Sequence, residues 1–355
     1  MGCFSGSSNF DNDLDSQSLI LNNEAVDKIL SSTPERNKIS LEELEKYFKN
    51  NPEISSLNIQ DKVLLVFKWI TNNISFDCET YMYTFQNRNG MNCLNLEEIY
   101  SEGKGISHDF SNLFLNILSA IDSNIETFLI KGYNKNIIYK FGTEIKEQNH
   151  EWLAVKINHR WYLVDPTFGA GYFIYKDKIL KFIKDYNPFY LFIHPQYLIK
   201  TNFPEDELWQ LNSKKMKKDN FYKLPIYKSN FFKLGFKSVE PEEGNLIIEK
   251  QGKIIISFQK NIDIKNIYLN GKLSYKEKNN SKEEHNAILI NKNDDHFEIL
   301  FYINKNIEYK LTLFAINSIS DKNNFKEIVV FKINKNNNTD NNFMMLICVF
   351  LIKNK

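Results

Sequence analysis

The sequence predicts an α+β domain, with helices packed on an antiparallel sheet, followed by an all-β sandwich domain. Apolar residues recur at helical spacing over much of the chain before residue 125, whereas short strand-like runs separated by turns dominate after residue 245. At 355 residues, of which 42% are hydrophobic, the chain is long enough for two packed cores. We therefore expect a flexible N-terminal arm (1–38), a first domain (39–225), a β-sandwich (226–335) and an Asn-rich linker with a short apolar tail (336–355).

The first domain is expected to begin with helices and to continue into a sheet. Ser40 and Glu43 form a capping-box pattern at the start of one helix, and a broad apolar face over residues 61–73 predicts a second. We expect a loop at 81–91 and a short helix at 94–100. Strands are predicted at 125–133, 149–157 and 161–165, and a turn at 158–160 joins the last two into a hairpin.

The second domain is predicted from its short strands. These runs are 245–248, 253–258, 264–269, 297–303, 309–316 and 328–333. The dipeptide Asn270-Gly271, which lies between apolar runs, is a strong signal for a two-residue hairpin turn. The economical interpretation is a β-sandwich with no catalytic group of residues in view.

The stretch from Gly103 to Phe114 is the one around which the first domain is organised. A glycine-containing turn leads into a helix whose apolar residues recur every three or four positions. Ser107 lies at the start of this helix, where backbone N–H groups lack partners and the helix dipole is positive. Its side chain can therefore be a helix cap, a common use of serine, or a nucleophile.

The predicted hairpin supplies two further candidate residues. His150 near the start of one strand and Asp165 at the end of the other could meet beside Ser107, in the chain order nucleophile, base and orienting carboxylate. The alternative is structural: His150 is simply held by Asp165, or Asp165 is a turn residue before Pro166. His108 is expected on a different helix face, exposed to solvent.

Several blocks in register resemble the transglutaminase-like proteins of the kyphoscoliosis-peptidase and cytokinesis-protein type. The blocks are residues 68–77, 103–114, 149–155, 161–171 and 203–211. The resemblance implies a papain-like fold in which the family's catalytic cysteine, histidine and aspartate align with Ser107, His150 and Asp165. The chain therefore departs from the family at the nucleophile. It departs again at Asp109-Phe110, Leu153 and Phe168.

The change of nucleophile decides which function we expect. A thiol at a helix N-terminus beside an imidazolium is partly ionised at neutral pH, whereas a serine hydroxyl must lose its proton to a base during the reaction. We therefore expect a catalytically inactive intracellular binding or scaffold protein, and the resemblance implies cytoskeletal protein partners. The alternative is an active hydrolase or acyltransferase that uses a Ser107–His150–Asp165 triad.

Net charge and cysteine spacing limit the kinds of partner and cofactor that we expect. Lys and Arg number 45 against 44 Asp and Glu, so the formal charge of +1 gives no general attraction to nucleic acid. The four cysteines show no C-x-x-C spacing and no secretory signal precedes them. We therefore expect a cytoplasmic protein with no disulfide framework, no metal site and no cofactor.

The two ends of the chain allow a membrane-associated alternative. The N-terminus approaches a myristoylation signal at Gly2, with Cys3 beside it as a palmitoylation site, although Gly6 stands where the pattern has serine or threonine. An accidental Gly-Ser-rich start explains the same residues. The apolar run at 343–352 is too short to span a bilayer as a helix. It is a strand, an interfacial segment or an error in the gene model.

Overall fold

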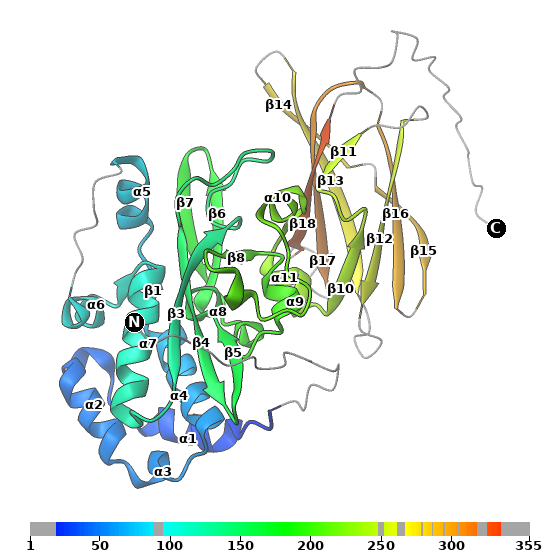
Figure 1. The fold of residues 1–355 in the computed structure, drawn as a ribbon. Helices are drawn as coiled ribbons and strands as arrows, with labels where there is room; N and C mark the ends of the chain where they lie inside the picture. Colours follow the sequence, from blue (N-terminus) through cyan, green and yellow to red (C-terminus); the bar gives the residue numbers. More distant parts are fainter. Residues whose placement is uncertain are drawn as a thin grey trace.

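The structure is a computed structural model with two units (Figure 1). It describes residues 19–87, 95–247, 252–260, 267–277, 280–285, 287–293, 295–303, 305–317 and 325–334. In Figure 1 the blue and cyan helices lie beside a green sheet, and the yellow-to-red strands form a second, layered unit next to it. The expected acylation sites Gly2 and Cys3 and the apolar run at 343–352 lie outside the described residues.

Two long helices, α4 (Ile59–Asn73) and α7 (Ser107–Ile121), pack together at the centre of the first unit. Most of α4 is buried, as expected for a helix with apolar residues on nearly every face. The predicted apolar stripe of α7, including Phe110 and Phe114, is also buried. The surrounding helices are α1 (Asn23–Ser32), α2 (Leu41–Asn50), α3 (Pro52–Ser55), α5 (Cys78–Asn87) and α6 (Leu96–Glu102), with a 3₁₀ turn η1 (Arg36–Lys38).

An antiparallel sheet of four strands lies against these helices. Its order is β5–β4–β3–β8, with bounds Arg160–Val164, His150–Ile157, Thr127–Asn134 and Asn202–Pro204. The predicted hairpin is the β4–β5 pair, whose turn places Asn158 and His159 at positive φ. Two short parallel strands, β1 (Ser75–Phe76) and β2 (Lys104–Gly105), lie just before α7.

The segment after Asp165 holds a second hairpin that the sequence analysis did not anticipate. It pairs β6 (Gly171–Lys176) with β7 (Ile179–Lys184). Its turn uses Asp177 and Lys178 at positive φ, in place of the Asn-Gly or Asp-Gly pairs that usually signal such turns. The short elements around it are α8 (Pro166–Ala170), η2 (Pro188–Tyr190), α9 (Pro195–Leu198) and η3 (Glu207–Gln210).

The second unit is a β-sandwich, as predicted. One sheet has the order β10–β12–β16–β15, with bounds Phe236–Glu240, Lys253–Lys260, His296–Tyr302 and Ala287–Lys292. The other has the order β11–β18–β17–β13–β14, with bounds Asn245–Ile247, Lys326–Asn334, Tyr309–Ile316, Tyr268–Glu277 and Asn280–Glu284, and β9 (Ile226–Tyr227) also pairs with β18. Residues such as Phe258, Phe301 and Phe331 form the core between the sheets. Helices α10 (Lys218–Lys223) and α11 (Ser229–Lys233) flank β9 along the chain.

The expectation of a flexible arm over residues 1–38 is wrong for its second half. Helix α1 lies there, and its Val26 and Ile29 are buried in the core of the first unit. The backbone N–H of Asn22 donates to Asp61 on α4 at 2.8 Å. The polar composition of this segment concealed a short amphipathic helix, and an ion pair between its Asp27 and Lys68 of α4 at 2.6 Å adds to its buried contacts.

The predicted loop at 81–91 is wrong as far as Asn87, where α5 ends. Asp77 lies just before this helix, and its Oδ1 accepts from the backbone N–H groups of Glu79 and Thr80, both at 3.0 Å. An aspartate ahead of a helix is a common N-cap, so this signal was available in the sequence and was overlooked.

The predicted hairpin turn at Asn270-Gly271 is also wrong, because both residues lie inside β13. Asn270 pairs with Phe314 and Gly271 with Leu313 of β17. A Cβ at Gly271 would lie 2.4 Å from the ring of Phe301. Glycine is therefore needed here for close packing within the sandwich, rather than for a turn.

The contacts between the two units include an aromatic stack and an ionic cluster. Phe189 stacks on Phe232, with ring centroids 4.9 Å apart. Asp185, which follows β7, accepts from Lys326 of β18 at 2.8 Å and from Lys233 of α11 at 3.2 Å. The end of the β6–β7 hairpin is thus tied to the sandwich.

Candidate active site

Ser107 is the first residue of α7, and the chain before it is tightly constrained. Gly103 ends α6 with a φ of 68°, and a Cβ at Gly105 would lie 2.6 Å from the Cβ of Asp109. The Oγ atom of Ser107 accepts a hydrogen bond from the backbone N–H of Glu151 at 3.3 Å, and the residue is only 5% exposed. The start of α7 is therefore held against strand β4.

The interpretation of Ser107 as a helix cap is wrong. Ile106 is the N-cap residue, and its N–H donates to the carboxylate of Asp109 at 2.8 Å. One turn further along α7, the Oγ of Ser111 donates to the carbonyl of Glu151 at 3.4 Å. Both serines thus bind the backbone of the residue that follows His150, which sets the position of α7 along β4.

His150 and Asp165 are joined by a fully buried hydrogen bond. Their Nε2 and Oδ2 atoms are 2.7 Å apart, and both side chains are 0% exposed. The backbone N–H of Phe168 donates to Asp165 Oδ1 at 3.2 Å, and Asn202 Nδ2 donates to Oδ2 at 3.0 Å. Asp165 accepts from three donors in all, so its orientation is fixed by the strand end, by α8 and by β8.

The ring of His150 is held between two aromatic side chains. Trp152 stacks on it with centroids 5.8 Å apart, and Phe168 meets it edge-on at 5.1 Å. Because Asp165 accepts from Nε2, the Nδ1 atom carries the lone pair in the neutral ring, as a general base requires. Nδ1 is buried without a hydrogen-bond partner among the described residues, so no hydrogen bond joins it to Ser107 Oγ.

A network of buried amides behind this pair was missed by the sequence analysis. Asn202 Oδ1 accepts from Asn134 Nδ2 and from Thr201 Oγ1, both at 2.8 Å. Asn149, the residue before His150, forms two hydrogen bonds with the backbone of Asn134, at 2.7 and 2.9 Å. This network therefore holds the start of β4 and the carboxylate of Asp165 in fixed positions relative to each other. Single asparagines scattered along a chain give no pattern from which such a network could be predicted.

His108 does not point freely into solvent, contrary to expectation. Its Nδ1 lies 2.9 Å from Glu151 Oε2, and Lys131 Nζ lies 3.4 Å from the other carboxylate oxygen. The hydrogen bond to Glu151 is the main reason why the pKa of His108 is raised. Burial alone would raise the pKa of Glu151, but His108 and Lys131 together lower it. An ion-paired cluster thus lies beside the candidate site, because His108 directly follows Ser107 and Glu151 directly follows His150 in the sequence.

Replacing His108 with glutamine should give a loss of stability that depends on pH. The contribution of His108 is full below its ordinary pKa of 6.5 and is lost as pH rises through the raised folded value. The contribution of Glu151 is full above 4.5 and is lost as pH falls through its lowered folded value. Urea unfolding should therefore show a cost of about 1 kcal/mol or less, largest between these two pH values.

The control for this measurement is His285→Gln, since His285 is exposed on the sandwich. A cost for His108→Gln that stays constant from pH 5 to pH 9, or equals that of the control throughout, would mean that the ion pair with Glu151 is not formed.

The described part of the chain holds no group of three or more His, Cys, Asp or Glu side chains arranged to bind a metal ion. In the same residues no helix is both long enough and apolar enough to cross a bilayer.

Each of the two units is similar to a known domain family. Residues 45–181 match the family described as transglutaminase-like domain, and this match includes Ser107, His150 and Asp165. Residues 218–346 match the family described as KY-like, immunoglobulin-like domain. The boundary between the two matches falls where the structure passes from the first unit to the sandwich.

Individual proteins are also similar to this chain in sequence. Kyphoscoliosis peptidase of Mus musculus is 26% identical over 256 residues, which cover 72% of this chain and 36% of that protein. Kyphoscoliosis peptidase of Homo sapiens is 28% identical over 194 residues, covering 54% and 27%. Hillarin of Drosophila melanogaster is 24% identical over 137 residues, covering 35% and 16%. The matched regions thus span about a third or less of the length of these relatives.

Proposed function

We propose that this protein is a transglutaminase-like binding or scaffold protein whose Ser107–His150–Asp165 site does not transfer acyl groups. The observation that carries the proposal is the hydrogen bonding of Ser107. Its Oγ accepts from the Glu151 N–H at 3.3 Å, whereas His150 Nδ1 has no partner among the described residues. A serine hydroxyl becomes a nucleophile when a base within hydrogen-bond reach takes its proton, and no such contact is formed here.

The loss of sulfur at this position, which we infer from the family resemblance, would be chemically decisive. A cysteine at a helix N-terminus beside a histidine is ionised before the substrate arrives, because the helix dipole and the imidazolium favour the thiolate. A hydroxyl gains little from the same surroundings, since it stays protonated at neutral pH. The buried His150–Asp165 pair is then retained because removing either partner would leave the other unsatisfied.

We propose a polypeptide as the ligand of this domain. Two relatives are named as peptidases, and the name implies that they act on polypeptides. The resemblance to their family leads us to propose a cytoskeletal protein as the partner, and a cytoplasmic location. Association with membranes through acylated Gly2 and Cys3 belongs to the same proposal.

Acyl-transfer assays test the proposal. Wild-type protein and Ser107→Ala should give equal, background rates of amine incorporation into casein and of peptide hydrolysis. Ser107→Cys is the control for an intact site, because it places the cysteine nucleophile of the family at the N-terminus of α7. Turnover by the wild type that disappears in Ser107→Ala would contradict the proposal.

The second candidate function is an active hydrolase or acyltransferase with a Ser107–His150–Asp165 triad. The orientation of His150 favours it, since Asp165 fixes Nε2 and leaves the Nδ1 lone pair available, which is the arrangement of a general base. Substrate binding would then have to bring Ser107 Oγ within hydrogen-bond distance of Nδ1, as catalytic contacts often tighten in the complex. The same assays distinguish the two candidates.

A further inference from the structure

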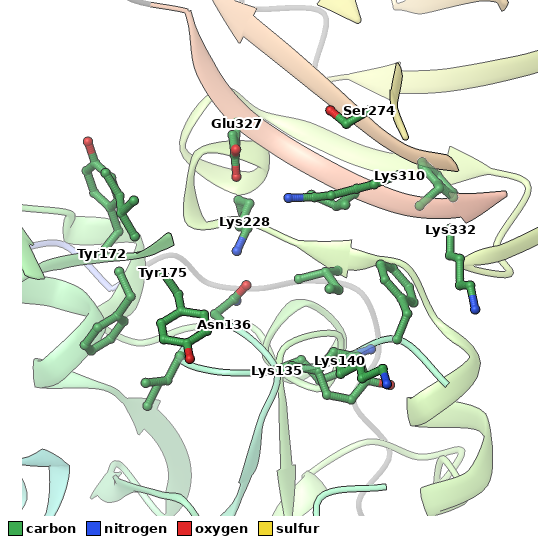
Figure 2. A pocket seen from close by; sticks show the side chains of 18 of the residues that line it. Lys135, Asn136, Lys140, Tyr172, Tyr175, Lys228, Ser274, Lys310, Glu327 and Lys332 are labelled. Atoms are coloured by element: carbon green, nitrogen blue, oxygen red, sulfur yellow. The ribbon is translucent and has the colours of Figure 1, made fainter. Parts of the chain in front are cut away.

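A cavity of about 870 Å³ lies between the two units (Figure 2). Residues 135–141 and strand β6 line it on the side of the first unit, and β17, β18 and residues 226–230 line it on the side of the sandwich. Its volume falls in the range of pockets that bind small organic molecules. Neither Ser107 nor His150 lines it, although Phe168, which packs on His150, also faces it.

The wall of this cavity is strongly basic. Its charged residues are Lys135, Lys140, Lys228, Lys276, Lys310, Lys326, Lys332, Glu308 and Glu327. Three of the lysines already have partners. Lys326 is paired with Asp185 and Lys332 with Glu308, at 2.8 and 2.9 Å. The ammonium of Lys135 donates to the carbonyl of Phe221 at 2.7 Å and, at longer range, to two more.

Lys140, Lys228, Lys276 and Lys310 remain without an ion pair or a side-chain hydrogen bond to any residue that the structure describes. Figure 2 shows Lys228 and Lys310 directed into the cavity, with Glu327 facing Lys228. Burial lowers the pKa of Lys228; Glu327 opposes this shift and Lys310 adds to it. An anion placed between Lys228 and Lys310 would offset the cost of desolvating the first and of holding two like charges close together.

Asn136 provides a separate indication of a ligand. The residue is 7% exposed and lines the cavity, and its Oδ1 has no hydrogen-bond partner among the described residues. In Figure 2 its side chain points in the direction of Lys228. A buried amide without a partner is uncommon, because leaving it unsatisfied is costly. Since the oxygen and nitrogen of an amide exchange places by a flip, Asn136 can also offer N–H donors to an anion.

We propose that this cavity binds a small polyanion whose phosphate or carboxylate groups lie between Lys228, Lys310 and Asn136. Rings of Tyr172, Tyr175 and Phe141 line the same space and suit an organic body on the ligand. Asn136 belongs to the first unit, whereas the two lysines belong to the sandwich side. A bound polyanion would therefore hold the two units together, and it would do so whether or not Ser107 is catalytic.

Calorimetric titration of the full chain with pyrophosphate and, separately, with citrate tests this proposal. The wild type should bind at least one of them, and added salt should weaken the binding. The double variant Lys228→Met/Lys310→Gln should bind at least about tenfold more weakly. The matched control is Lys237→Gln, which removes an exposed lysine of β10 outside the cavity and should bind like the wild type.

Binding of pyrophosphate alone would assign a phosphate ligand, and binding of citrate alone a carboxylate ligand. The proposal is overturned if the wild type binds neither, or if the double variant and the control bind equally, which would indicate attraction to surface lysines in general. Should the double variant not fold, the exposed Lys310→Gln change alone provides the comparison. None of these outcomes depends on acyl transfer at Ser107.

Discussion

Replacing Ser107 with cysteine should create a thiol that reacts with iodoacetamide at least about a hundredfold faster than Cys78 at pH 7. Burial is the main cause that raises the pKa of Cys78, to about 11, so only about one molecule in 10⁴ is a thiolate there. A cysteine at residue 107 would lie at the N-terminus of α7 beside His150, surroundings that lower thiol pKa values to roughly 3.5–7.5. Alkylation rates of each cysteine, followed by peptide mass spectrometry, measure the difference.

Ser111→Cys is the matched control, because Ser111 lies one turn along the same face of α7 and is fully buried. Its thiol should react no faster than that of Cys78. Adding His150→Ala to Ser107→Cys should slow alkylation by raising the thiol pKa. If the cysteine of Ser107→Cys reacts no faster than Cys78, the inferred geometry at the N-terminus of α7 is wrong.

Replacing Asp165 with alanine should destabilise the protein by roughly 3–5 kcal/mol, because a buried donor that loses its acceptor costs about 1–3 kcal/mol. The change removes the acceptor for His150 Nε2, for Asn202 Nδ2 and for the N–H of Phe168. All three donors are buried, so water cannot replace the carboxylate without opening the core. Urea unfolding measures the free energy of unfolding.

Asp206→Ala is the control, because Asp206 accepts one hydrogen bond, from the N–H of Leu208 at 2.9 Å, at an exposed 3₁₀ turn. That loss should cost about 1 kcal/mol. Equal losses in the free energy of unfolding for the two variants would show that the buried hydrogen bonds of Asp165 contribute no more to stability than one exposed helix cap. The stability of the buried His150–Asp165 pair would then not explain its retention.

Local signals in the sequence were enough to predict the elements that carry the site. The glycine turn before Ser107, the apolar stripe of α7 and the turn between β4 and β5 are all short-range features. They predicted the N-terminus of α7 and the hairpin that brings His150 to Asp165. The family resemblance added a transglutaminase-like fold for the first domain, and the family match over residues 45–181 supports this expectation.

Features that depend on distant residues could not be predicted in this way. Gly271 is glycine because the ring of Phe301 approaches it from the opposite sheet, so its neighbour Asn270 wrongly suggested a turn. Asn202 reaches Asp165 from a strand 37 positions away. His108 meets Glu151 only because α7 packs on β4. Each of these contacts is created by the fold and leaves no periodic trace in the sequence.

The claim that Ser107 does not transfer acyl groups is tested most directly by labelling the folded wild-type protein with a serine-directed fluorophosphonate. We predict no label at residue 107, and the same result for Ser107→Ala. A stoichiometric adduct on Ser107 that is absent from Ser107→Ala and lost in His150→Ala would show that the hydroxyl is activated by this histidine, and would contradict the account.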